Sequence, residues 1–282
     1  MTWLGFALLG VVFVSITTIF QKILMSHRDS NPSTCGILYH LLLGVVYFLC
    51  ASMMGVSIDF SQGSLSFVFL AALLWSLTTV YFFKAIQLIQ PAEVTIISTF
   101  QVLVVILASV LFLGEVFDIY MIFGALIIIL GSCIVLRFKD GFYLNRGVLY
   151  TLMLSLFAGL AVVVDSINVQ HYNVILYGTI INFLSAFMLW GFYPRAMVEW
   201  KKYIKIDYIQ NLLAVVVFSM IQGVLFLKAL SFGGVTGQIA TIRQASIVLT
   251  VVLSVVFLKD REHLMQKSIA GALVTWGVML LS

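Results

Sequence analysis

Ten long stretches of apolar residues follow one another along the 282-residue chain, separated by short polar segments. Each has about the 20 residues that an α-helix needs to cross a bilayer. They are continuous rather than alternating, and so they predict helices and not the strands of a barrel. The stretches lie at about 2–24, 34–56, 65–88, 92–113, 117–137, 146–168, 174–193, 207–230, 235–258 and 264–281.

The composition requires the same environment. Hydrophobic residues make up 62% of the chain and charged residues 9%, whereas roughly a quarter of a soluble domain is charged. In lipid, the backbone must satisfy its hydrogen bonds internally. The first stretch lacks a basic start and has Lys22 at its far end, so it predicts a retained helix and not a signal peptide. We expect an all-α membrane protein with ten transmembrane helices, located in the inner (cell) membrane of a bacterium.

The chain contains an internal repeat. FKAI at 83–86 parallels LKAL at 227–230, which places Lys84 and Lys228 144 residues apart. These matches divide the chain into two five-helix halves, 1–140 and 141–282. An odd number of spans per half predicts that the second half is inverted in the membrane relative to the first. Many secondary transporters have this architecture, with the substrate site between the repeats near the midplane.

These motifs resemble a known family. FKAIQLIQPAEV, VLFLGE and IFGALIIILG in the first half, and LKALSFGGVTGQIATIRQASIVLTVVLSVVFLKD with IAGALVTWG in the second, are similar to the EamA-type repeat of the drug/metabolite transporter superfamily. The resemblance implies ten helices and the export or exchange of small metabolites, amino acids among them, without ATP hydrolysis. The second copy departs from the first where Gly114-Glu115 is replaced by Lys259-Asp260.

One permanent cation lies deep in the ninth stretch. Arg243 is about three residues, or roughly 4–5 Å, from its centre, where inserting an arginine costs about 2.5–3.5 kcal/mol. Thr236, Ser246 and Thr250 share its side of the helix, so this side is predicted to face a wet cavity. Two interpretations remain open. Arg243 is either a structural strut, bonded to Asp165 or to helix-end carbonyls, or its planar guanidinium binds a carboxylate or phosphate of the substrate.

Polar and aromatic residues on other helices complete the predicted cavity, although such stripes also serve in helix packing. Asp165 and Glu93 are candidates for proton coupling, although Glu93 also suits the positive end of a helix. Lys84 and Lys228 are expected to be interfacial anchors. The additional cavity candidates are Ser15, Thr18, Trp75, Thr79, Phe82, Gln222 and Phe226.

Other chemistry has little support in the sequence. Cys35, Cys50 and Cys133 share no ligand spacing, and no second histidine stands three or four residues from His40, so neither a metal site nor a cofactor is expected. We find no phosphate loop, no GxSxG and no pair of acidic residues on one helix face, and therefore expect no enzyme.

The basic residues predict an orientation in the membrane. Thirteen of the fifteen lie in or beside the loops that follow odd-numbered helices. The positive-inside rule therefore places these loops in the cytoplasm and both termini outside, whereas the family resemblance implies cytoplasmic termini. The net charge of +4 is thus a signature of topology and not of nucleic-acid binding.

We therefore expect a secondary transporter, an exporter of small organic metabolites such as amino acids, that works by alternating access. Its partners would be a small-molecule substrate bearing a carboxylate and the lipid bilayer, with no nucleic acid. The sequence leaves monomer and homodimer open. It also leaves open two other functions, a flippase for a lipid-linked sugar and a non-transporting intramembrane protein.

Overall fold

The computed structural model describes residues 2–26, 30–56, 64–114, 145–233, 235–259 and 264–281, with short pieces between 119 and 131. Within these ranges the chain is helical and contains no strand. The helices are α1 (Trp3–Ser26), α2 (Pro32–Met53), α3 (Leu65–Leu88), α4 (Pro91–Ile97), α5 (Phe100–Leu113), α7 (Arg146–Asn168), α8 (Val174–Phe192), the 3₁₀ helix η1 (Pro194–Ile204), α9 (Ile206–Ser231), α10 (Thr236–Arg243), α11 (Ser246–Leu258) and α12 (Leu264–Leu281).

Seven stretches of described helix, with α4 and α5 counted together, are long and apolar enough to cross a membrane. α11 is a shorter apolar helix. The prediction of an all-α, multi-pass integral membrane protein is therefore confirmed. The predicted helix at 117–137 lies largely outside the described residues.

Asparagine side chains fix where several helices begin. Asn31 accepts hydrogen bonds from the first N–H groups of α2, at 3.0 and 3.4 Å, and Asn173 does the same for α8, at 2.9 and 3.4 Å. Asn145 caps α7 through the N–H of Val148, at 2.8 Å. Such caps satisfy N–H groups that have no partner within the helix. The caps of α2 and α8 are 142 residues apart, which is a structural trace of the internal repeat.

Two of the predicted helices are interrupted. The stretch 92–113 forms α4 and α5 with Ser98 and Thr99 between them, and the stretch 235–258 forms α10 and α11 with Gln244 and Ala245 between them. At each break an N–H bonds to the carbonyl three residues earlier, Thr99 to Ile96 at 3.2 Å and Ala245 to Ile242 at 3.0 Å. Bonds of this type tighten the helix into a short 3₁₀ turn. Both halves of the chain therefore carry a broken helix at corresponding places.

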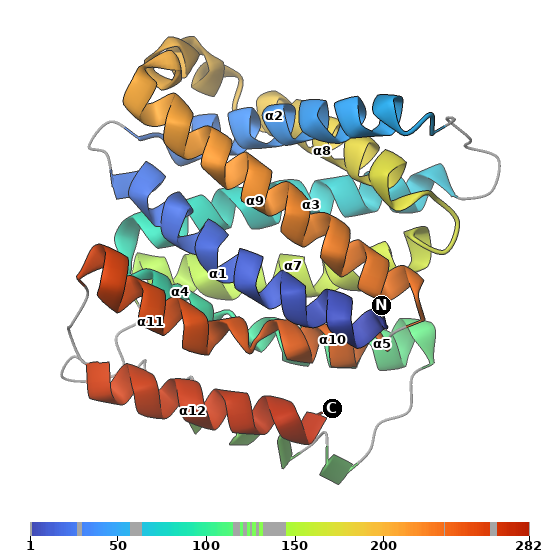
Figure 1. Cartoon of the computed structure of the whole chain (residues 1–282), viewed down its shortest axis with the longest axis vertical. Helices are drawn as coiled ribbons and strands as arrows, with labels where there is room; N and C mark the ends of the chain where they lie inside the picture. Colours follow the sequence, from blue (N-terminus) through green and yellow to red (C-terminus); the bar gives the residue numbers. More distant parts are fainter. Residues whose placement is uncertain are drawn as a thin grey trace.

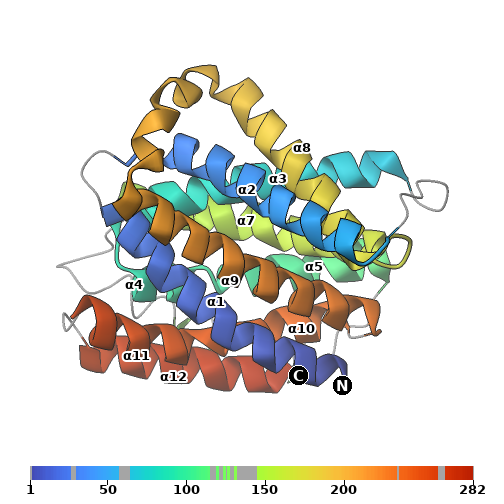
Figure 2. The same ribbon diagram turned by 45° about the horizontal axis from the view of Figure 1, so that its top comes forward.

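The packing of the helices also repeats (Figures 1 and 2). α3 lies along α7, and α1 lies along α9, while α2 packs against α8. α5 contacts α7, and α11 contacts α1. The counterparts in the repeat are α1 and α7, α2 and α8, α3 and α9, and α5 and α11. When each helix is replaced by its counterpart, these contacts are unchanged. The described core is thus built from pairs of corresponding helices.

One such pair of contacts uses two kinds of chemistry. Ser15 of α1 donates a hydrogen bond to the carbonyl of Ser246, at 3.1 Å, where α11 begins. The residue 144 positions later, Gly159 of α7, lies so close to α5 that a Cβ atom would be 2.7 Å from the side chain of Val104 and 3.0 Å from the carbonyl of Gln101. The hydrogen bond between α1 and α11 thus corresponds to a close approach of the backbone of α7 to α5.

Both broken helices end in a left-handed residue. Gly114 follows α5 with φ 70°, and Lys259 follows α11 with φ 55°. Their N–H groups bond to the carbonyls of Ser109 and Ser254. Glycine adopts this conformation freely, whereas a residue with a Cβ atom is strained there by about 1–2 kcal/mol. The lysine therefore retains the turn at an energetic cost that the first half avoids.

Replacing this lysine tests the cost. Lys259→Gly is expected to raise the free energy of unfolding by about 1 kcal/mol, because it removes the clash of Cβ with its own backbone. Thermal or denaturant unfolding of the detergent-solubilised protein would measure it.

Gly114→Ala is the matched reverse change. No atom lies within 4 Å of the added Cβ, so the expected loss of about 1 kcal/mol comes from the backbone alone. A decrease in stability on Lys259→Gly would show that contacts of the lysine side chain outweigh the strain.

Candidate functional site

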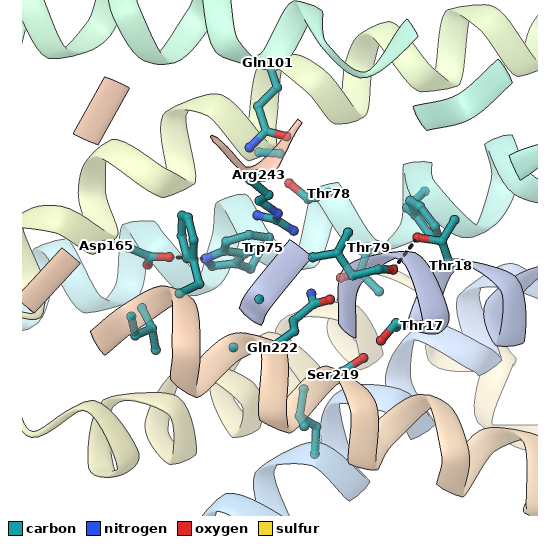
Figure 3. A pocket seen from close by; sticks show the side chains of 18 of the residues that line it. Thr17, Thr18, Trp75, Thr78, Thr79, Gln101, Asp165, Ser219, Gln222 and Arg243 are labelled. Atoms are coloured by element: carbon teal, nitrogen blue, oxygen red, sulfur yellow. Dashed lines mark hydrogen bonds between the residues drawn. The ribbon is translucent and has the colours of Figure 1, made fainter. Parts of the chain in front are cut away.

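A cavity of about 220 Å³ lies inside the bundle (Figure 3). Residues from α1, α2, α3, α4, α5, α7, α8, α9, α10 and α11 line it. The lining is mixed, with aromatic side chains, hydroxyls and amides beside two charged residues. These are Asp165 and Arg243.

Most of the sequence-predicted site residues lie at this cavity. Ser15 and Thr250 do not line it, although both are fully buried. Glu93 also lies elsewhere. Its carboxylate accepts a hydrogen bond from the N–H of Gln90 at 3.4 Å and forms a capping box at the start of α4. The predicted residues that line the cavity are Thr18, Trp75, Thr79, Phe82, Asp165, Gln222, Phe226, Arg243 and Ser246.

The cavity wall contains pairs of residues that correspond in the repeat. On α3 and α9, at a spacing of 144 residues, the pairs are Trp75 and Ser219, Thr78 and Gln222, and Phe82 and Phe226. On α1 and α7, at the same spacing, they are Gly10 and Leu154, Val14 and Ala158, and Gln21 and Asp165. The cavity therefore lies between the two halves of the chain.

Asp165 is held in the wall by two donors. It is 2% exposed, and it accepts hydrogen bonds from Trp75 Nε1 at 2.9 Å and from the Tyr177 hydroxyl at 2.6 Å. Figure 3 shows the first of these bonds. The Tyr177 oxygen in turn accepts a hydrogen bond from Asn168 Nδ2, at 3.1 Å. The carboxylate thereby joins α7 to α3 and α8.

Arg243 is the last residue of α10 and directly precedes the break. The Cζ atom of its guanidinium lies 5.1 Å from the centre of the Phe226 ring, a distance typical of a cation–π contact. Asp165 and Tyr39 interact electrostatically with the guanidinium. Among the described side chains, however, no carboxylate oxygen lies within 4.0 Å of its nitrogens. The donors of this guanidinium thus have no close anionic partner in the described part of the protein.

His40 is a cavity residue that the sequence analysis set aside. It is 3% exposed, with Nδ1 2.8 Å from Asn182 Oδ1 and Nε2 2.8 Å from Thr79 Oγ1. The amide nitrogen of Asn182 donates to the carbonyl of Gly178, at 2.7 Å, so that its oxygen faces the imidazole. With the amide in this orientation, Nδ1 donates to Asn182, and the second hydrogen bond of the ring joins Nε2 to the hydroxyl of Thr79.

His40 and Asn182 also correspond in the repeat, since they are 142 residues apart, like the two asparagine caps. Their direct hydrogen bond therefore joins corresponding positions of the two halves. His40 was not predicted as a cavity residue, because it has no second metal ligand three or four residues away. The sequence did contain a signal for this site. His40 is a polar residue within an apolar stretch, and Asn182 matches it in the other half.

Further buried polar atoms of the wall lack a hydrogen-bond partner among the described residues. Thr17 Oγ1 and Gln222 Oε1 are among them. Unpaired buried polar groups cost about 1–3 kcal/mol each. A polar ligand in the cavity would satisfy them.

The lysines near the helix ends make contacts outside the cavity. The Lys84 ammonium lies 5.4–5.6 Å from the ring centres of Tyr81, Tyr150 and Tyr193. Lys228 lies 5.8 Å from the ring centre of Phe6, which corresponds to Tyr150 at a spacing of 144 residues. These cation–π contacts join α3 to α7 and α9 to α1.

The described residues contain no group of three His, Cys, Asp or Glu side chains that would hold a metal ion. Cys35 is buried and Cys50 is half-buried, and both are free thiols. Cys133 lies outside the described residues.

The hydrogen bonds to Asp165 yield a test of stability. Tyr177→Phe leaves a buried carboxylate without one of its donors, and we expect the free energy of unfolding to fall by about 1.5–3 kcal/mol. Asp165→Asn in the same protein should recover part of this loss. Unfolding of the single and double variants in detergent would measure the coupling.

Tyr172→Phe is the matched control. The Tyr172 ring stacks on that of Tyr177, with ring centres 6.3 Å apart, but its buried hydroxyl has no hydrogen-bond partner among the described residues. Its removal should leave stability unchanged or slightly higher. Equal losses in the two phenylalanine variants would contradict the role of the Tyr177 hydroxyl.

Comparisons with known proteins agree with this architecture. The model of the EamA-like transporter family matches the chain twice, over residues 1–137 and 145–282. A solved structure, described as "Crystal structure of protein", is similar with a TM-score of 0.70 and 17% identity over 97% of each chain, which indicates a shared fold. No match is found among curated proteins. Because the two family matches span nearly the whole chain, the protein belongs to the EamA-like transporter family and is a membrane transporter.

Proposed function

We propose that this transporter moves a small organic solute bearing a carboxylate, and that Arg243 binds the carboxylate. The observation that carries the proposal is a guanidinium at the cavity with no carboxylate of the described residues within 4.0 Å. A guanidinium in a membrane is costly unless a polar environment surrounds it, and its planar donors match a carboxylate in two parallel hydrogen bonds. A solute anion supplies the missing partner.

The rest of the wall supports a solute with more than one functional group. The hydroxyl of Thr79 lines the cavity and suits an ammonium or hydroxyl group. Trp75, Phe82 and Phe226 provide apolar surface. The volume of about 220 Å³ is below the range of about 300–1,000 Å³ that is usual for drug-sized ligands. Amino acids and metabolites of similar size fit these features.

The repeat supports alternating access as the mechanism. We infer ten helices in two inverted halves, with 117–137 as the fifth helix of the first half and α12 as its counterpart. Two observations support this inference. The helix contacts stay the same when corresponding helices are exchanged, and the cavity lies between the halves. Rocking of one half against the other would expose the cavity to each side in turn. The breaks at 98–99 and 244–245 are the points where the backbone beside the cavity can adjust.

We propose export in exchange for protons, across the inner membrane of a bacterium, with the loops rich in basic residues in the cytoplasm. Asp165 is the candidate carrier of the proton. The groups that face it are Tyr177 on α8, Trp75 on α3 and, through space, Arg243 on α10. His40 on α2 lines the same cavity. Protonation of Asp165 would remove its attraction for Arg243 and so change the binding of a solute anion.

The role of Arg243 can be tested by substitution. Carboxylates that raise the thermal stability of the purified protein would first be identified and then used for uptake into proteoliposomes. Arg243→Gln is expected to weaken binding and transport about 10–100-fold, because charged hydrogen bonds contribute about 1.5–3 kcal/mol. Arg243→Lys should lie between this variant and the wild type, since it keeps the charge but loses the planar fork.

Ser98→Ala is the matched control for Arg243. Ser98 lies at the first break, as Arg243 lies at the second, and it also lines the cavity, but it carries no charge. Its change should alter carboxylate binding by less than about fivefold. If Arg243→Gln lowers the yield of folded protein but leaves carboxylate affinity intact, Arg243 is a strut and the proposal is wrong.

Proton coupling has a separate test. In proteoliposomes with a pH gradient, the wild type should accumulate solute above equilibrium, whereas Asp165→Asn should only equilibrate it and keep solute exchange. Glu93→Gln serves as the control, since Glu93 caps α4 away from the cavity, and it should still respond to the gradient. Continued accumulation by Asp165→Asn would exclude Asp165 as the proton carrier.

A further inference from the structure

The segment between α8 and α9 contributes none of the residues that line the cavity. η1 and the following residue have the sequence PRAMVEWKKYIK, with four basic residues and one acidic residue. In Figure 1 it projects from one end of the bundle, where the chain passes from α8 into α9. The sequence analysis used these charges only to predict orientation.

One face of η1 is fixed to the bundle. Thr34 Oγ1 of α2 donates a hydrogen bond to the carbonyl of Ala196, at 2.8 Å. The N–H of Asn31 donates to the Tyr203 hydroxyl, at 2.6 Å. Ala196 and Tyr203 are buried, and the Tyr203 ring packs edge-on against Tyr208, with ring centres 5.2 Å apart. The segment is therefore held in a defined position on α2 and α9.

The other face combines apolar and cationic side chains. Val198 is 79% exposed and Trp200 is 41% exposed. Arg195, Lys201 and Lys205 are exposed as well. Among the described side chains, no carboxylate lies within 4.0 Å of these three cations. Exposed valine and tryptophan beside unpaired cations are typical of helices that lie in the interface of a membrane.

The position of η1 fits a lipid surface better than a protein partner. The end of α8 leads into it with exposed Trp190, Phe192 and Tyr193, and aromatic side chains of this kind gather where hydrocarbon meets headgroups. Two other lysines of helix ends are already in contact with the protein. Lys22 donates to helix carbonyls at 2.8 and 3.0 Å, and Lys84 lies among three tyrosine rings. Arg195, Lys201 and Lys205, by contrast, are exposed to the surroundings.

We propose that η1 is an interfacial helix that binds the headgroups of anionic phospholipids. Val198 and Trp200 enter the boundary of the acyl chains, and Arg195, Lys201 and Lys205 contact the phosphates. Because anionic lipids are enriched in the cytoplasmic leaflet, such binding fixes this end of the bundle at that leaflet. The proposal goes beyond the transport proposal and holds for any solute.

The test measures lipid retention, without any solute. The purified full-length protein is exchanged into detergent with equal amounts of phosphatidylglycerol and phosphatidylcholine of the same acyl chains, and retained lipid is counted by native mass spectrometry. The wild type should retain phosphatidylglycerol preferentially. Each cation near an anionic surface raises affinity about fivefold, so Arg195→Gln/Lys201→Gln should lower the preference about twentyfold.

Arg146→Gln/Lys259→Gln is the matched control, because it removes one arginine and one lysine that are also exposed, at the start of α7 and the end of α11. It should keep the preference for phosphatidylglycerol. A second readout is the quenching of tryptophan fluorescence by brominated phosphatidylglycerol, which should decrease in Trp200→Phe.

Two results would overturn the proposal. One is equal retention of the two lipids by the wild type. The other is an equal loss of preference in the two double variants, which would assign the effect to the total charge of this end and not to η1. Thermal unfolding of each variant shows that the exposed substitutions leave the fold intact.

Discussion

Inside a bilayer, every backbone N–H and C=O group needs a partner within the protein, and this requirement governs the whole structure. It explains why the described chain consists of helices, and it makes the two interruptions notable. At the first break, Ser98 Oγ donates to the carbonyl of Thr95 at 2.9 Å, and Thr99 Oγ1 donates to that of Ile96 at 2.6 Å. At the second break, Ser15 bonds to the carbonyl of Ser246. Irregular backbone is therefore found beside the cavity, where hydroxyl groups satisfy it.

The two halves share their scaffold but differ in their chemistry. Asparagine caps, broken helices and left-handed turns recur at nearly constant spacing. At the cavity, Gln21 of the first half corresponds to Asp165 of the second, and the uncharged Ser98 lies at the first break where Arg243 lies at the second. Both charges of the wall are thus contributed by one half. If the halves are inverted, the cavity has one charged and one neutral end, and a solute anion has a preferred direction within it.

The sequence predicted the fold closely where hydrophobic length decides the structure. The predicted stretches 65–88 and 146–168 coincide with α3 and α7, because lipid requires about the same length of every spanning helix. The breaks were not predicted, since neither contains proline or glycine, and local hydrogen bonds of serine and threonine produce the first one. η1 was expected to be a loop, because its charges exclude it from the hydrocarbon core. The same charges are compatible with a 3₁₀ helix outside that core, which is what the segment forms.

The site was predicted only in part, because a sequence shows which residues share a helix face but not which helix that face meets. Ser15 was assigned to the cavity with Thr18, yet it faces α11. Asp165 was predicted as a partner of Arg243 or a proton carrier, but its hydrogen bonds to Trp75 and Tyr177 in the cavity wall were not predicted. These donors come from other helices, and no local pattern identifies them.

The hydrogen bond between His40 and Asn182 has a mechanical consequence. If a two-fold axis relates the two halves, two corresponding residues in contact lie beside that axis, where a turn of one half against the other displaces them least. In the proposed motion this pair would act as a pivot that joins α2 to α8. The contact would then preserve the alignment of the halves while the outer helices slide.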